Sequence, residues 1–173
     1  MNDLENLFAI LATNPRLGSA AICEKYGISP RAVSLAFGPF IWRVRFDGNR
    51  FIEDANGEMA GVLPIIDGGY FTDLVAFTTD KIATHDGRAF CLGDLSLPNF
   101  ADAPLRVFRH PLQWLQNNCD GIVILKPEIA WRELDHVALL GAEDEVHRLS
   151  LMRLMAPPKS RVKILIPKTK AAA

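Results

Sequence analysis

The hydrophobic period of the chain changes at Gly38-Pro39. Ahead of this pair the apolar residues recur at helical spacing, and behind it they alternate as in a half-buried strand. Residues 40–46 alternate in this way, Asp47-Gly48-Asn49 suits a tight turn, and the alternation resumes over 50–53. The sequence therefore predicts a helical segment that ends near residue 38, followed directly by a β-hairpin.

Three helices are predicted before the change of period. The first covers residues 3–13, where leucine and phenylalanine share one face. The second covers residues 19–26 and ends at Gly27, since glycine accepts the left-handed geometry of a helix end. The third covers residues 29–37 and starts at Ser29-Pro30, because serine caps a helix and proline fits its first position.

Strands and helices alternate beyond a candidate domain boundary at residues 54–57. Turn residues separate expected strands at 61–66, 74–78, 89–92, 122–125, 137–140 and 162–166. Helices are expected at 111–118, 128–134 and 143–155. Such alternation is typical of parallel strands with crossovers. The predicted fold class is α+β, with an N-terminal three-helix, winged-type unit (1–57) followed by a mixed α/β domain (58–173) that has a partly parallel sheet.

Residues 19–37 resemble the helix-turn-helix of bacterial DNA-binding proteins. Tyr26 would face the core, Gly27 would make the turn, and Val33 would anchor the second helix. The hairpin that follows stands where winged variants carry their wing. The resemblance implies a recognition helix in the major groove and a hairpin that grips the backbone. The expected DNA contacts are Ser29, Arg31 and Ser34 on the helix, and Arg43, Arg45 and Arg50 on the hairpin.

A second resemblance covers residues 121–168, which are similar to the end of a toprim domain of primase-like proteins from mobile elements. That family ends one strand in a glutamate and the next in paired aspartates that hold a divalent metal. Here Lys126 stands at the glutamate position, and Gly141 and Glu143 stand at the aspartate positions. The resemblance therefore implies a scaffold that has lost its catalysis.

Composition limits the classes of function. The net charge is −1, and residues 1–57 carry as many acidic as basic side chains, which argues against bulk electrostatic coating of nucleic acid and leaves room for a local basic patch. The three widely spaced cysteines form no metal or disulfide motif, which favours a reducing compartment. The first five residues are acidic and do not have the basic start and apolar run of a signal peptide, and no apolar run reaches the ~20 residues of a spanning helix. We expect a cytoplasmic protein with no membrane contact.

Two charged groups have alternative interpretations. Glu143, Asp144 and Glu145 with His147 suit a metal cluster, but acidic residues also favour the first turn of a helix. His110 with Arg106 and Arg109 suits either an anion site or a solvated loop. No phosphate-binding loop, dinucleotide fingerprint or nucleophile elbow occurs, and we expect no cofactor and no metal.

Three hypotheses of function follow. The first is a non-enzymatic DNA-binding accessory or regulatory protein, of phage or mobile-element origin, that contacts double-stranded DNA. A homodimer would suit it, because paired recognition helices are a common docking arrangement. The second is a protein–protein interaction module with a catalytically degenerate toprim-like domain. The third is a metal-dependent nucleic-acid enzyme that uses Glu128, Glu143 or Asp144.

Overall fold

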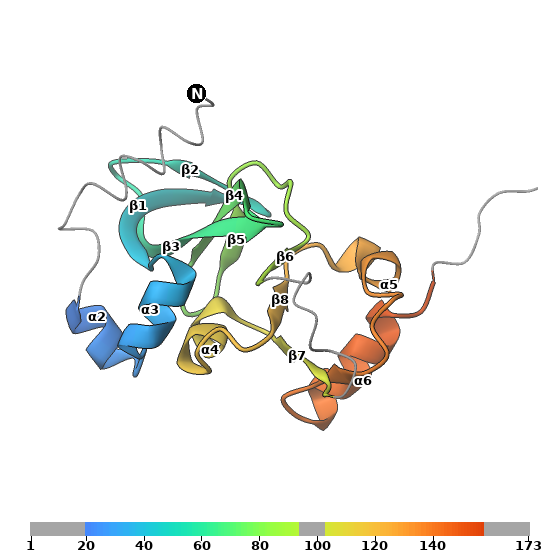
Figure 1. The fold of residues 1–173 in the computed structure, drawn as a ribbon. Coiled ribbons are helices and arrows are strands. Elements are labelled where there is room, and N and C mark those ends of the chain that lie inside the picture. The colour runs from blue at the N-terminus through green and yellow to red at the C-terminus, as the bar shows by residue number, and fades with distance from the viewer. Residues whose placement is uncertain (1–19, 94–102, 158–173) are drawn as a thin grey trace, which may run out of the picture.

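A closed five-stranded barrel lies beside a smaller four-stranded sheet in the computed structural model, which describes residues 20–93 and 103–157 (Figure 1). Two short helices precede the barrel and three helices accompany the second sheet. The first two are α2 (Ala20–Lys25) and α3 (Pro30–Ala36). The barrel strands are β1 (Phe40–Asp47), β2 (Arg50–Glu53), β3 (Glu58–Asp67), β4 (Tyr70–Phe77) and β5 (Ile82–Thr84).

The barrel closes because β2, the partner of β1 on one edge, also meets β5 at the other end of the sheet. β1 is antiparallel to β2 through the hairpin turn at Gly48, and antiparallel to β3 from Phe40 to Val44. β3 and β4 pair along nearly their whole lengths, β4 pairs with β5, and a short parallel contact between Arg50 and Thr84 completes the ring. Alternate side chains point inward, and Val44, Phe51 and Leu74 are fully buried in the interior.

The expected fold class is wrong, because the predicted hairpin is not a wing. β1 and β2 form part of a barrel that also takes β3, β4 and β5 from beyond residue 57. Val44 and Phe51 point to one side of the hairpin and need cover, which those later strands supply. Among the described residues only α2 and α3 precede the barrel, and the helix expected at 3–13 lies outside them. The described residues therefore contain no three-helix unit ahead of the barrel, and their fold is mostly β with short helices.

The second sheet has the strand order β6-β8-β7-β9, and its parallel pairings both involve β7, a strand that the sequence did not predict. Its strands are β6 (Cys91–Leu92), β7 (Leu105–Phe108), β8 (Ile122–Ile124) and β9 (Leu140–Gly141). β7 is parallel to both β8 and β9, whereas β6 is antiparallel to β8. Three helices follow these strands: α4 (Pro111–Gln116), α5 (Ala130–Glu133) and α6 (Glu145–Leu154). The strand expected at 162–166 lies outside the described residues.

One hydrophobic core joins the barrel to the second sheet. α3 contributes Ala32, the outer side of β3 contributes Leu63, and α4 contributes Trp114 and Leu115 to the same cluster. Figure 1 shows α4 between α3 and the second sheet. A separate cluster on the other side of the second sheet contains Leu151 of α6. The barrel and the sheet therefore pack against each other through buried side chains and share a core.

A buried carboxylate fixes the segment between β5 and β6. Asp73 of β4 is fully buried. Its Oδ1 accepts hydrogen bonds from the backbone N–H groups of Leu74 and Asp86, at 2.8 Å each. Its Oδ2 accepts from the N–H groups of Arg88 at 2.7 Å and Ala89 at 3.4 Å. One side chain thus satisfies four backbone donors that would otherwise lack partners in the interior.

No helix within the described ranges is long and apolar enough to cross a membrane.

Candidate nucleic-acid interface

The segment from α2 to α3 has the local geometry that its sequence predicts. Gly27 makes the turn with a φ of +64°, which favours glycine. Ser29 caps α3, and its Oγ accepts a hydrogen bond from the backbone N–H of Ala32 at 3.0 Å. Pro30 occupies the first helical position, where its missing N–H costs nothing. Ala32 and Ala36 are buried, so the opposite face of this short helix is exposed.

That exposed face carries two of the three predicted groove contacts. Arg31 and Ser34 are exposed, and the guanidinium group of Arg31 has no hydrogen-bond or ion-pair partner among residues 20–93 and 103–157. The third predicted contact, Ser29, already has a partner. Its Oγ donates a hydrogen bond to Oδ1 of Asn118, in the turn between α4 and β8, at 2.5 Å. The start of α3 therefore packs against the turn between α4 and β8 and is not open on every side.

The turn between α4 and β8 has an uncommon backbone conformation. Asn118 and Cys119 have φ values of +56° and +61°, which non-glycine residues seldom adopt. Their N–H groups donate to carbonyl oxygens of α4, at Leu115 and Trp114. Burial raises the pKa of the Cys119 thiol to about 11, and this thiol donates to the carbonyl of Ala32 at 3.6 Å. The turn is therefore held against both α3 and α4.

An open, polar depression with a volume of about 510 Å³ lies between α3 and this turn. We call it the polar hollow, and it is lined by Arg31, Arg106, Gln116, Asn117, Asn118, Cys119 and Asp120. Arg31 comes from α3 and Arg106 from β7, and the remaining residues come from the end of α4 and its turn. The polar hollow thus brings two guanidinium groups and three side-chain amides to one surface.

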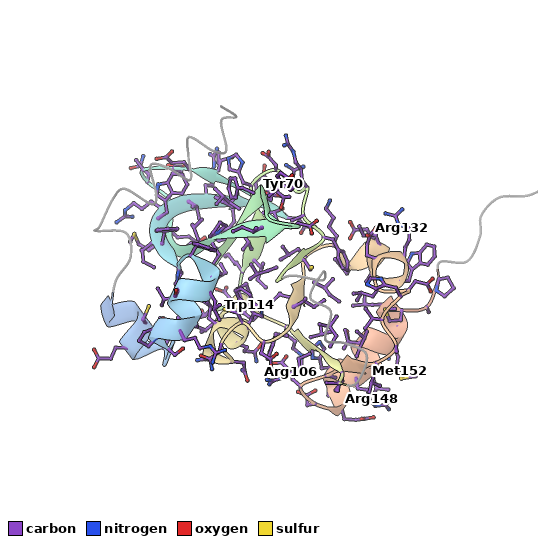
Figure 2. All side chains as sticks on the ribbon, in the orientation of Figure 1. Tyr70, Arg106, Trp114, Arg132, Arg148 and Met152 are labelled. Carbon is purple, nitrogen blue, oxygen red and sulfur yellow. The ribbon has the colours of Figure 1, made fainter. Side chains whose placement is uncertain are left out.

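Arg106 is held in position by three contacts (Figure 2). It donates to Oδ1 of Asn117 at 2.8 Å, and its guanidinium lies 4.9 Å from the centre of the Phe108 ring. A longer ion pair of 3.4 Å to Asp120 partly offsets its charge. Arginine presents five N–H donors, so these contacts leave donors for an external anion.

The three hairpin arginines lie on the outer surface of the barrel and are not part of the polar hollow. Arg43 donates to the carbonyl of Gly57 at 3.0 Å, and Arg45 lies 3.7 Å from Asp54. Arg50 donates to the carbonyl of His85 at 3.1 Å. Arg50 pairs with Asp47 at the far end of β1, roughly 23 Å along that strand from Phe40, at 3.3 Å a residue. None of the three hairpin arginines therefore lines the polar hollow together with Arg31.

The acidic residues considered for a metal site face an arginine instead. Arg109 follows β7 and donates two hydrogen bonds to the carboxylate of Asp144, at 2.6 and 2.7 Å. Its backbone N–H donates to Glu143 at 3.1 Å. Asp144 also caps α6 by accepting from the N–H of His147 at 2.8 Å. Within the two described ranges no group of three or more histidine, cysteine or acidic side chains is arranged to hold a metal ion.

These contacts shift the protonation equilibria of the cluster. The Arg109 guanidinium and the N–H of His147 hold the pKa of Asp144 well below its usual range. Burial and the charge of Arg109 lower the pKa of His147. Burial likewise lowers the pKa of His110, whose Nδ1 accepts from the N–H of Leu112 and caps α4. The cluster therefore holds Asp144 ionised and disfavours the charged form of both histidines.

Two patterns along the chain point in part to the polar hollow. Arg106 stood out as part of a small basic group, and the run from Asn117 to Gly121 has the composition of a turn. Neither pattern indicates that this turn lies beside Arg31, because the two segments are separated by more than eighty positions and come into contact only when the chain folds.

No protein-family model matches the chain, and neither the curated proteins nor the solved structures yielded a match.

Proposed function

We propose that this protein is a non-enzymatic, cytoplasmic DNA-binding accessory or regulatory protein, and that it contacts nucleic acid through the polar hollow. The observation that carries the proposal is the convergence of Arg31 and Arg106 on one exposed, amide-lined surface. Guanidinium groups bind phosphate oxygens through paired hydrogen bonds, and amide side chains bond to phosphates or base edges. The three free cysteines suit a reducing compartment such as the cytoplasm.

The proposal changes the expected set of DNA contacts. Ser29 acts as a helix cap and as a partner of Asn118, which makes it a positioning residue. Arg106 and Asn118 join Arg31 as contacts. The hairpin arginines form a separate surface that can be tested independently, because they lie outside the polar hollow.

The test is fluorescence anisotropy of the full chain with a mixed-sequence DNA duplex at low and moderate salt. We expect binding that weakens with salt, because each phosphate contact contributes a slope of about −0.9 in log K against log salt. Arg31→Gln and Arg106→Gln should each weaken binding and make that slope shallower by roughly one. Arg45→Gln and Arg50→Gln are the matched controls and should leave both quantities unchanged.

Two outcomes contradict this proposal. Loss of binding in the two hairpin variants, with none in the two hollow variants, would place the interface on the barrel. Absence of binding by the wild-type chain at low salt would remove DNA as the ligand. Circular dichroism of each variant establishes that any loss does not come from unfolding.

A second candidate function, protein–protein interaction, is favoured by the outer face of α6. Val146, Leu149 and Met152 recur at a spacing of three, so they share one face, and they are 73%, 43% and 59% exposed. Leu139, in the connection before β9, is also exposed. We propose a homodimer in which this stripe packs on its copy. Sedimentation equilibrium should show a dimer that Leu149→Asp dissociates, whereas a wild-type monomer at high concentration would contradict it.

A further inference from the structure

A second cleft, which shares no lining residue with the polar hollow, has no role in the proposed DNA contact. It lies between the β3–β4 hairpin of the barrel and α5, with a volume of about 570 Å³. Volumes of this size suit small-molecule ligands. We call it the anion cleft for the charges described below. The side chains that matter to the argument are Phe71, Arg88, Phe90, Lys126, Arg132 and Glu133.

Three cationic side chains reach the anion cleft from separate segments. Arg88 comes from the loop after β5, Lys126 follows β8, and Arg132 lies on α5, where Figure 2 labels it. Nζ of Lys126 donates to the carbonyl of Arg88 at 2.8 Å, which fixes the ammonium group beside the loop. Only two acidic residues, Asp67 and Glu133, also line the cleft, so its lining carries a positive excess.

The two guanidinium groups keep donors for a ligand. Arg88 contacts Asp86 through one nitrogen at 3.2 Å. Arg132 donates to a single oxygen of Glu133, from Nε at 3.0 Å and from one terminal nitrogen at 2.7 Å. Since arginine has five N–H donors, each residue can bind an anionic oxygen without giving up these contacts.

The cleft also has apolar, aromatic walls. Phe71 and Phe90 are half-buried and line it from β4 and from the residue before β6. Aromatic rings provide flat faces on which a planar heterocycle stacks. A site that combines cations with aromatic faces therefore suits a ligand that has an anionic group and a planar ring.

The frame of the anion cleft is fixed before any ligand binds. Asp73 accepts hydrogen bonds from the backbone of Arg88 and Ala89, which both line the cleft. Lys126 follows the carboxyl end of β8, the edge at which α/β sheets place their ligands. A register shift between Ile65 and Ile66 adjoins the cleft, and such bulges often re-aim side chains beside sites. A prearranged site loses less entropy on binding.

We propose that the anion cleft binds a planar heterocycle that carries a phosphate, the chemistry of a nucleoside monophosphate. The phosphate lies among Arg88, Lys126 and Arg132, and the ring lies against Phe90. The same chemistry occurs in a free nucleotide and in the phosphorylated end of a DNA strand, and the test separates these two sources.

Isothermal titration of the full chain with adenosine monophosphate, adenosine and inorganic phosphate tests the proposal. We expect the monophosphate to bind at least about tenfold more tightly than either fragment, because charge-assisted hydrogen bonds and stacking act together. Lys126→Gln and Arg88→Gln should each weaken it by about tenfold or more. Phe90→Leu should reduce its advantage over inorganic phosphate. Arg148→Gln, on α6 and paired with Glu145, is the matched control and should change nothing.

Several results overturn the proposal. The proposed site is contradicted if the monophosphate shows no saturable binding, if inorganic phosphate binds equally well, or if the binding survives both Lys126→Gln and Arg88→Gln. A duplex with a 5′-phosphate, compared with the same duplex without it, distinguishes a strand end from a free nucleotide as the source. Because the titration with monophosphate contains no DNA, its failure is distinguishable from failure of the proposed DNA contact at Arg31 and Arg106.

Discussion

Replacement of Asp73 tests a buried carboxylate that accepts four backbone hydrogen bonds. Asp73→Ala leaves four backbone N–H groups without their acceptor, at about 1–3 kcal/mol for each one that stays buried. Two effects reduce that sum. First, Arg88 is exposed, so water can reach part of the loop and hydrogen-bond to its N–H groups. Second, the variant no longer buries a carboxylate, which costs several kcal/mol in the wild type. We therefore expect a net loss of about 3–5 kcal/mol in the free energy of unfolding.

Asp73→Asn removes part of the hydrogen bonding while it keeps the size and shape of the side chain. The amide oxygen keeps two of the four bonds, while the amide nitrogen points its hydrogens at two N–H donors. We expect a loss of about 2–3 kcal/mol, which is a large part of a typical stability of about 5–15 kcal/mol. For Asp73→Ala the melting temperature should fall by roughly 10 °C.

The assay is equilibrium unfolding in urea, followed by tryptophan fluorescence and extrapolated linearly to water. Asp67→Asn is the control, because this residue is exposed on the same barrel, and its effect should stay within about 0.5 kcal/mol. If Asp73→Asn falls within the range of that control, the four hydrogen bonds do not stabilise the fold and the reasoning is refuted.

Three further perturbations test other contacts. In Gly61→Ala the new Cβ would lie 2.7 Å from the Phe77 ring, so we expect a loss of about 1–3 kcal/mol in urea unfolding, and Phe77→Leu should partly restore it. The pKa of Asp144 is lower in the folded than in the unfolded chain, so its stabilisation is complete above about pH 4 and is lost as the pH falls further. The stability difference between wild type and Arg109→Gln should therefore shrink from pH 6 to pH 3, and an unchanged difference would contradict this ion-pair assignment. Because burial raises the pKa of Cys119 to about 11, iodoacetamide should alkylate it much more slowly in the folded than in the urea-unfolded chain near neutral pH, as read by mass spectrometry.

Local features of the chain were predictable where a local rule decides them. The start of α3 at Ser29-Pro30, the turn at Gly27 and the two strands around Gly48 all follow from the conformational preferences of a few neighbouring residues. The role of the hairpin was not predictable in this way. Whether its apolar side meets a helical unit or three more strands depends on pairing between β1 and β3, across the turn at residues 54–57 that was expected to be a boundary.

Short strands were missed for a related reason. β5 has three residues and β7 has four, too few for alternation to stand out, and pairing partners determine both. The strand expected at 137–140 pairs only over Leu140–Gly141, because Val137 belongs to a turn in which its N–H donates to the carbonyl of Leu134.

The candidate sites depend mainly on contacts between distant segments. The exposure of Arg31 follows from the helical pattern around Ala32 and Ala36, but its proximity to Arg106 depends on the packing of α3 against α4. Asp73 is an acidic residue within an apolar strand, and its four donors come mostly from residues 86–89. No pattern along the chain indicates that these donors converge on it.

The barrel is closed by its shortest strand pairing, which lies between β2 and β5. Its antiparallel contacts join β1 to β2, β1 to β3, β3 to β4 and β4 to β5, all of which are close in sequence, whereas β2 and β5 meet through the single Arg50–Thr84 pairing. That seam is reinforced by the hydrogen bond from the N–H of Thr84 to the carbonyl of Asn49 at 3.0 Å. Because this pairing joins residues farther apart in sequence than the other barrel pairings do and few bonds hold it, we expect the seam to form late in folding and to open before the other pairings. A barrel opened there presents two unpaired strand edges, so the charged and turn residues around Asn49 and Arg50 also protect the protein against joining edge to edge with its own copies.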